Sequence, residues 1–170
     1  MPLWKRQCVE GPNVAVGPGS PGSTSVSKYS CLTPSPDVFT SIWNKISDIV
    51  RSNTLLATEE VLFELEKNDD GIFFEWAKNH ASMFVPLNDG IQVEVASILN
   101  SYPRLVDTRR ERSGADPFVL ALAKMESLTV ITSEKLTGRL DKPNIPDACT
   151  ALGIRCLHPL EMFRELGWRV

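Results

Sequence analysis

The chain has 170 residues and a mass of 18.9 kDa, which is enough for one domain of ordinary size and too little for two. Its 42% hydrophobic and 23% charged residues exclude a largely disordered chain, a collagen-like chain and a coiled coil. A net charge of −3 and a pI of 5.4 exclude binding of nucleic acid through bulk positive charge. Any such binding must therefore be local.

The longest apolar stretch, residues 118–123, is far shorter than a bilayer span, so no transmembrane helix is expected. No apolar signal segment follows the first methionine, and the two histidines stand far apart from each other and from any cysteine pair. We therefore expect a cytoplasmic protein with reduced thiols and no structural zinc site. The thiols are Cys8, Cys31, Cys149 and Cys156.

The composition divides the chain in two. Residues 1–35 are rich in Gly, Pro and Ser and are predicted to form an irregular tail, whereas residues 36–170 are periodic and form the domain. Within the tail, Gly17–Gly22 matches the G-x-G-x-x-G phosphate motif in form only. Its prolines and the serines that follow supply no helix on which a pyrophosphate could bind, so a dinucleotide site is not expected.

From residue 36 onward, helices alternate with short apolar strands. Ser35-Pro36-Asp37 has the composition of a helix start, and apolar residues at helical spacing follow it. The complete prediction places helices at 37–50, 58–67, 70–79, 88–99, 116–123, 146–152 and 159–166, and strands at 54–57, 83–87, 128–132 and 154–157. This alternation predicts the α/β class, as a three-layer α/β/α domain with a short parallel sheet.

Four carboxylates stand where ligands of such sheets bind, beyond the carboxyl ends of strands or at the start of the next helix. Glu64 lies on the helix after the first predicted strand, and Asp116 opens its helix. Glu134 follows the 128–132 strand, and Asp147 stands at the head of a short helix. Carboxylates that converge repel one another unless a hard divalent cation such as Mg²⁺ or Mn²⁺ lies between them.

Basic residues stand next to these acids in the sequence and could hold a phosphate backbone. They are Arg109, Arg110, Arg112, Lys135, Arg139 and Lys142. Each acid also has a structural interpretation. Asp116 suits a helix N-cap, Asp147 complements a helix dipole, Glu64 could be a solvated helix residue, and Glu134 could pair with Lys135.

The order of these motifs resembles the PIN-domain (PilT N-terminus-like) nuclease superfamily, and most of all a bacterial and archaeal PIN-like subgroup. The resemblance covers about residues 36–170. The segments that carry it are Val61-x-x-Glu64-Leu65, Pro36-Asp37-Val38-Phe39, Ser113-Gly-Ala-Asp-Pro-Phe118, Val130-Ile-Thr-Ser-Glu134, Lys142-Pro-Asn-Ile-Pro-Asp147 and Phe163-Arg-Glu-Leu-Gly-Trp168.

The resemblance implies a metal-dependent ribonuclease in which three or four acids hold Mg²⁺ or Mn²⁺, and many of its members are toxins with an antitoxin protein. Glu64, Asp116 and Glu134 are then the catalytic and metal-binding residues, with Asp147 as an outer metal ligand. Arg109, Arg110, Arg112, Lys135 and Arg139 are the expected RNA contacts. RNA, an antitoxin-like protein and a second copy of the chain are the partners that it suggests.

One family motif is missing from this chain. The family begins with a strand in the middle of the sheet that ends in Asp-Thr-Ser or similar, and its aspartate is a central metal ligand. Val26–Leu32 is the segment expected to replace that strand, and it would deliver Leu32 in place of the acid. A frameshift, a deletion or a misassigned start before Asp37 would account for the difference. The alternative function is therefore a catalytically inactive PIN-like module that binds RNA or a protein partner.

Overall fold

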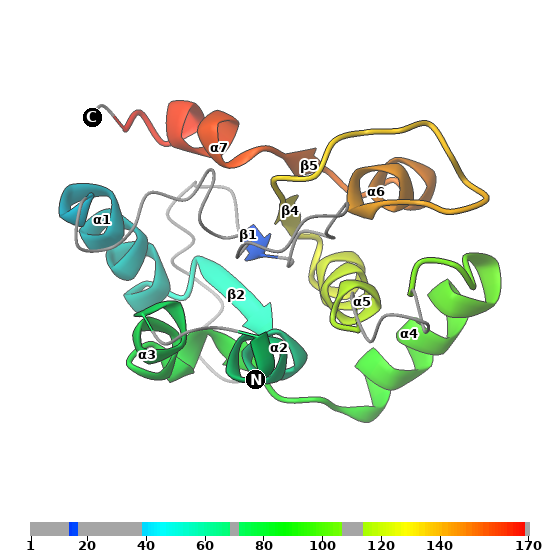
Figure 1. Cartoon of the computed structure of the whole chain (residues 1–170), viewed down its shortest axis with the longest axis horizontal. Helices are drawn as coiled ribbons and strands as arrows, with labels where there is room; N and C mark the ends of the chain where they lie inside the picture. The colour runs from blue at the N-terminus through cyan, green and yellow to red at the C-terminus, as the bar shows by residue number, and fades with distance from the viewer. Residues whose placement is uncertain (1–13, 17–38, 69–71, 107–113, 169–170) are drawn as a thin grey trace, which may run out of the picture.

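The computed structural model describes residues 14–16, 39–68, 72–106 and 114–168. Its strands form one five-stranded sheet in the order β3-β2-β1-β4-β5 (Figure 1). Every pairing is parallel. The strands are β1 (Val14–Val16), β2 (Leu55–Thr58), β3 (Phe84–Val85), β4 (Thr129–Ile131) and β5 (Cys156–Leu157).

Helices connect these strands, so the protein belongs to the mixed α/β class. The type and order of every element predicted after residue 36 are confirmed, with ends shifted by a few residues. The helices are α1 (Thr40–Arg51), α2 (Glu59–Asn68), α3 (Ile72–Lys78), the 3₁₀ helix η2 (Ala81–Met83), α4 (Asp89–Ser101), α5 (Asp116–Glu126), α6 (Ile145–Leu152) and α7 (Pro159–Glu165).

Helix α5 forms the centre of the core. Residues Val119 to Ala123 are all buried, so the helix has no wide polar face in its middle. Such a helix must be covered on all sides, and α5 indeed packs against β1, β2 and β4 as well as α4 and α6. Helix α1 instead buries one face and packs against β2. In Figure 1, α1 and α5 lie on different sides of β1 and β2.

The middle of the sheet corrects one expectation. The prediction of an irregular tail is wrong at Val14–Val16, which form the central strand between β2 and β4. Val14 and Ala15 pair with β2, and all three residues pair with β4, so this short strand is paired on both sides. The Gly- and Pro-rich flanks concealed this short run. The replacement expected at Val26–Leu32, and the rest of residues 1–35, lie outside the described residues.

Across the described part of the chain, we find no helix that is both long enough and apolar enough to span a membrane.

Candidate functional site

Three helix N-termini lie at the carboxyl edge of the sheet. Helix α2 begins directly after β2. Helices α5 and α6 end only two or three residues before β4 and β5 begin, so that their C-termini lie at the amino edge and their N-termini at the carboxyl edge. Asp116 and Asp147 belong to the first turns of α5 and α6, Glu134 belongs to the segment after β4, and Glu64 lies in the middle of α2 and reaches the start of α5. The prediction that the chain brings these acids to one edge is therefore consistent with its topology.

Glu64 and Asp116 meet at the start of α5. The Glu64 carboxylate accepts a hydrogen bond from the backbone N–H of Ala115, with 3.0 Å between Oε1 and N. Ala115 has no side chain that could cap the helix, so the acceptor comes from α2. Asp116 is the first residue of α5 and is only 2% exposed. A Cβ atom at Gly114 would lie 3.3 Å from Glu64 Oε1, so the absence of a side chain there gives Glu64 its close approach.

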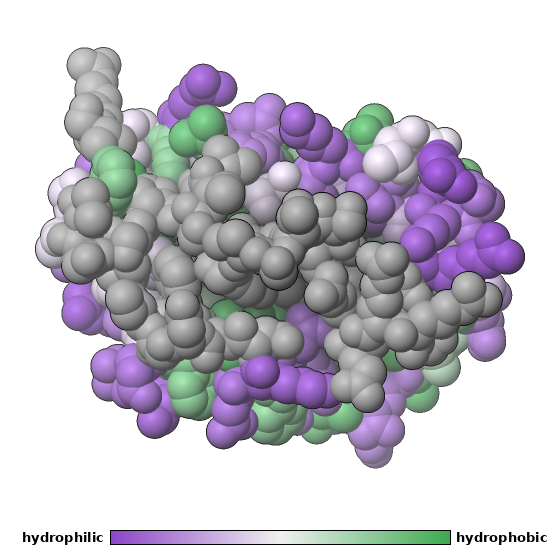
Figure 2. Space-filling model, viewed as in Figure 1, coloured by the Kyte–Doolittle hydropathy of each residue, from purple (hydrophilic) through white to green (hydrophobic). Residues whose placement is uncertain are grey.

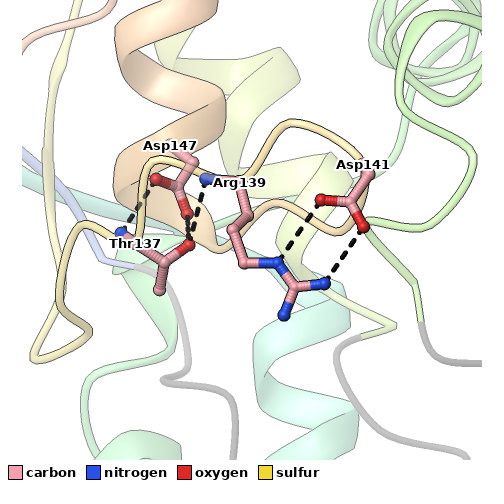
Figure 3. Close-up of polar contacts among 4 residues, drawn as sticks. All are labelled: Thr137, Arg139, Asp141 and Asp147. Atoms are coloured by element: carbon pink, nitrogen blue, oxygen red, sulfur yellow. Dashed lines mark hydrogen bonds and ion pairs between the residues drawn. The ribbon is translucent and has the colours of Figure 1, made fainter.

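Glu134 and Asp147 both accept hydrogen bonds at the start of α6, and Asp147 accepts four. Glu134 Oε2 accepts from the N–H of Ile145 at 2.9 Å. Asp147 Oδ1 accepts from the N–H groups of Thr137 (2.9 Å) and Gly138 (2.7 Å). Its Oδ2 accepts from the Thr137 hydroxyl (2.6 Å) and the Asn144 N–H (3.1 Å), and Figure 3 shows Thr137 beside it.

These four hydrogen bonds decide the charge state of Asp147. Burial alone would raise the pKa of its carboxyl group, but the hydrogen bonds from Thr137, Asn144 and Gly138 hold the pKa below the ordinary value of 3.8. Since a carboxylate has about four acceptor positions, those of Asp147 are filled by the chain itself. Asp147 therefore fastens the segment before α6 to the helix.

That segment, residues 133–144, presents basic and apolar side chains to solvent. The Asn144 side chain donates to the Lys135 carbonyl at 3.1 Å, which holds the two ends of this segment together. Arg139 pairs with Asp141 at 3.1 Å (Figure 3), and this hydrogen-bonded guanidinium lowers the pKa of the Asp141 carboxyl. Leu136 is 64% exposed and Leu140 56% exposed. In Figure 2, hydrophilic residues predominate on the right-hand side, where α6 lies in Figure 1.

Of the basic residues predicted to contact RNA, Lys135 and Arg139 lie on this exposed segment. Arg109, Arg110 and Arg112 lie outside the described residues.

The described residues do not assemble the metal centre that the PIN resemblance implies. Within residues 14–16, 39–68, 72–106 and 114–168, no three side chains of His, Cys, Asp or Glu gather closely enough to hold a metal ion. The central strand ends in Val16, and Gly17 follows it in the sequence, so no acid stands directly after this strand. The described residues therefore do not fit the complete centre of three or four carboxylates, and the role of these acids as metal ligands stays a prediction.

One polar side chain at this edge was not predicted as a site residue. Thr58 ends β2 and is 2% exposed, and its hydroxyl oxygen has no hydrogen-bond partner in the described part of the structure. In the sequence it looks like the start of the next helix, which concealed its burial. Beside it, burial together with the charges of Glu59 and Glu64 raises the pKa of Glu60. Negative charge therefore accumulates at the head of α2.

Residues 28–170 match the model of the family described as "Domain of unknown function (DUF4411)". The chain belongs to this family. The match includes β2 to β5 and all of the helices above, whereas β1 precedes it. The central strand of the DUF4411 domain in this chain is thus supplied by residues before the matched region. No curated protein and no solved structure gives a significant match to the chain.

Proposed function

We propose that this DUF4411 protein is a PIN-like domain of three-layer α/β/α architecture that binds RNA at the carboxyl edge of its sheet, with an incomplete ribonuclease centre. Two features of the fold support this proposal. All pairings among the described strands are parallel, and the first of these strands stands in the middle of the sheet, as the PIN resemblance implies. The predicted acids also lie at the edge where such domains bind their ligands.

The observation that carries the proposal is the difference between the carboxylates at this edge. Glu64 accepts the backbone N–H of Ala115, the residue that precedes the buried Asp116 at the head of α5. Glu134 likewise accepts one backbone N–H, that of Ile145, whereas Asp147 accepts four donors from its own chain and has no acceptor position left for a cation. Without Asp147, and without an acid directly after β1, the centre offers a divalent cation less negative charge than the four acids of the PIN resemblance, so we expect RNA binding without efficient hydrolysis.

The exposed segment after β4 supplies the positive charge that an acidic protein needs for RNA. Lys135 directly follows Glu134, and Arg139 and Lys142 come next along the chain. Arg139 is paired with Asp141, but an exposed ion pair is weak and can be exchanged for a phosphate contact. We propose that these cations position the RNA backbone across the acidic edge.

A second function, a metal-dependent ribonuclease with Mg²⁺ or Mn²⁺ and a toxin-like role, is favoured by the contact of Glu64 with the start of α5 beside Asp116. An antitoxin-like protein and a second copy of the chain as partners, and a location in the cytoplasm, also belong to this proposal.

Binding of a fluorescent single-stranded RNA tests the first proposal. The variant K135E/R139E should bind several-fold more weakly, and the slope of log affinity against log salt should fall by roughly 2 because two phosphate contacts are lost. The matched control is R51E. Arg51 also forms an exposed ion pair, with Asp48, but it ends α1 just before β2 begins, at the opposite edge of the sheet. Equal losses in both variants would contradict an RNA site at the carboxyl edge.

Cleavage of the same RNA separates the two functions. The unmodified protein should show weak or no cleavage with Mn²⁺, and Gly17→Asp, which adds a carboxylate directly after the central strand, should increase it. Strong Mn²⁺-dependent cleavage by the unmodified protein that is lost in Asp116→Asn would favour the ribonuclease instead. If the RNA binds neither the unmodified protein nor the Gly17→Asp variant at low salt, both proposed functions are contradicted.

A further inference from the structure

The turn between α6 and β5 brings two cysteines together. Helix α6 ends at Leu152, Gly153 adopts a left-handed conformation with φ of 69°, and the chain reverses into β5. The Ile154 N–H donates to the Cys149 carbonyl at 2.8 Å, which closes this turn. Cys149 on α6 and Cys156 at the start of β5 therefore face each other, and their thiols are hydrogen-bonded.

The two thiols differ in their access to solvent. Cys149 is fully buried (0% exposed), whereas Cys156 is half-buried. The strand that carries Cys156 is an edge strand of the sheet, since it pairs with β4 alone among the described strands. A small reagent therefore reaches Cys156 first and finds Cys149 directly behind it.

The difference in access sets the order of reaction. Since a thiolate is the nucleophile toward a peroxide and Cys156 is the thiol that solvent reaches, Cys156 reacts first.

We propose that Cys156 and Cys149 form a reversible thiol–disulfide site whose oxidant is a hydroperoxide. The Cys156 thiolate attacks one peroxide oxygen, the O–O bond breaks, and Cys156 becomes a sulfenic acid while the alkoxide or hydroxide leaves and takes a proton from water. The sulfur of Cys149 then attacks the Cys156 sulfur, and the hydroxyl group leaves with the Cys149 proton as water. Two thiols are oxidised to one disulfide, and one hydroperoxide is reduced.

The geometry suits a local reaction. The sulfur atoms must close from hydrogen-bond contact to a bond of about 2.05 Å, which side-chain rotation can supply when the backbones already adjoin. A dithiol reductant reverses the reaction by exchange through Cys156. This proposal does not rest on RNA binding, because no acid or cation of the carboxyl edge takes part in the exchange of bonds between the two sulfur atoms.

The test uses the full chain with C8S and C31S, so that only this pair of thiols remains. Hydrogen peroxide should remove two hydrogens from the intact mass, and dithiothreitol should restore them. Trypsin should cleave after Arg155, which lies between the two cysteines, so the disulfide should join two peptides, residues 140–155 and 156–164. Oxidation of Cys156 to a sulfinic acid without these linked peptides would overturn the proposal.

Two further variants test the order of the steps. With Cys149→Ala, dimedone should trap a sulfenic acid at Cys156, and with Cys156→Ser, Cys149 should stay reduced. Rapid oxidation of Cys149 in the second variant would contradict the assignment. Should either variant fail to fold, alkylation of the C8S/C31S protein gives the same information, because Cys156 should be labelled much faster than Cys149. Equal labelling rates in the folded protein would again count against it.

Discussion

Helices α5 and α6 begin at the same edge of the sheet and both use carboxylates at their first turn, but in opposite ways. At α6, Asp147 belongs to the helix itself and accepts four hydrogen bonds from residues within ten positions of it. At α5, the backbone N–H of Ala115 is capped by Glu64, which lies 51 positions away on α2. One N-terminus is closed by its own sequence and the other by a distant element.

The comparison teaches how to separate a structural carboxylate from a candidate functional one. Burial does not separate them, because Asp116 and Asp147 are both 2% exposed. The number of backbone donors aimed at the carboxylate does, since a carboxylate with four N–H or O–H donors has little capacity left for a cation or a substrate. By this measure Asp147 is a structural anchor of α6.

The largest expected effect is at the anchor. Asp147→Ala should lower the free energy of unfolding by about 3 to 4 kcal/mol, because three backbone N–H groups and one hydroxyl lose their acceptor. Thr137→Val is the matched control, since it removes the hydroxyl hydrogen bond and should cost about 1 kcal/mol. Urea denaturation measures both. Equal losses in the two variants would show that the backbone donors do not depend on Asp147.

The sequence predicts the start of α6 better than the start of α5, because the first depends on local residues and the second on a distant one. The start of α6 can be predicted from the sequence because Asn144, Pro146 and Asp147 lie within one turn and form a local start signal. The contact of Glu64 with Ala115 cannot be predicted from the sequence, since nothing in the local sequence of α2 indicates the partner of Glu64. Topology alone places both acids at the carboxyl edge, and this was predicted from the alternation of helices and strands.

The central strand shows the other limit of sequence reasoning. Val14-Ala-Val16 is too short to produce a periodic signal, and its Gly- and Pro-rich surroundings predict a loop. Its position results from pairing with β2 and β4, which begin 41 and 115 residues after Val14 in the registers Val14 to Leu55 and Val14 to Thr129. Such long-range pairing depends on the completed sheet, so only the structure could show it.

A smaller effect is expected at α5. Glu64→Ala should cost about 1 to 2 kcal/mol of stability, because the Ala115 N–H loses a charged acceptor at a helix N-terminus. Glu64→Gln keeps an oxygen acceptor and should cost less, about 0.5 kcal/mol, since only the charge is removed. Glu66→Ala, at an exposed position of the same helix, is the matched control and should be within about 0.5 kcal/mol of the unmodified protein.

Metal binding sharpens the Glu64 experiment. If the head of α5 holds a divalent cation, Glu64→Gln should abolish weak Mn²⁺ binding in a calorimetric titration while its stability stays close to that of the unmodified protein. Unchanged Mn²⁺ binding in this variant would assign Glu64 to helix capping alone. The carboxylates at the starts of α5 and α6 would then both be structural.

The smallest effect is a change in how stability depends on pH. The folded-state pKa of Asp147 is held below its ordinary value of 3.8, so its charged form is favoured in the folded protein. A depressed pKa stabilises the fold fully above the unfolded value, and this contribution is lost as the pH falls through the folded value. The stability difference between the unmodified protein and Asp147→Asn should therefore be constant above about pH 5 and should shrink as the pH falls below 3.8.

Asp141, whose pKa is also lowered, is present in both proteins, so its contribution cancels in the comparison. Urea denaturation at about pH 7, 5, 4 and 3 measures the difference. A difference that stays constant to the lowest pH would mean that the charge of Asp147 does not stabilise the anchor, and that α6 is closed by hydrogen bonds which a neutral side chain can also accept.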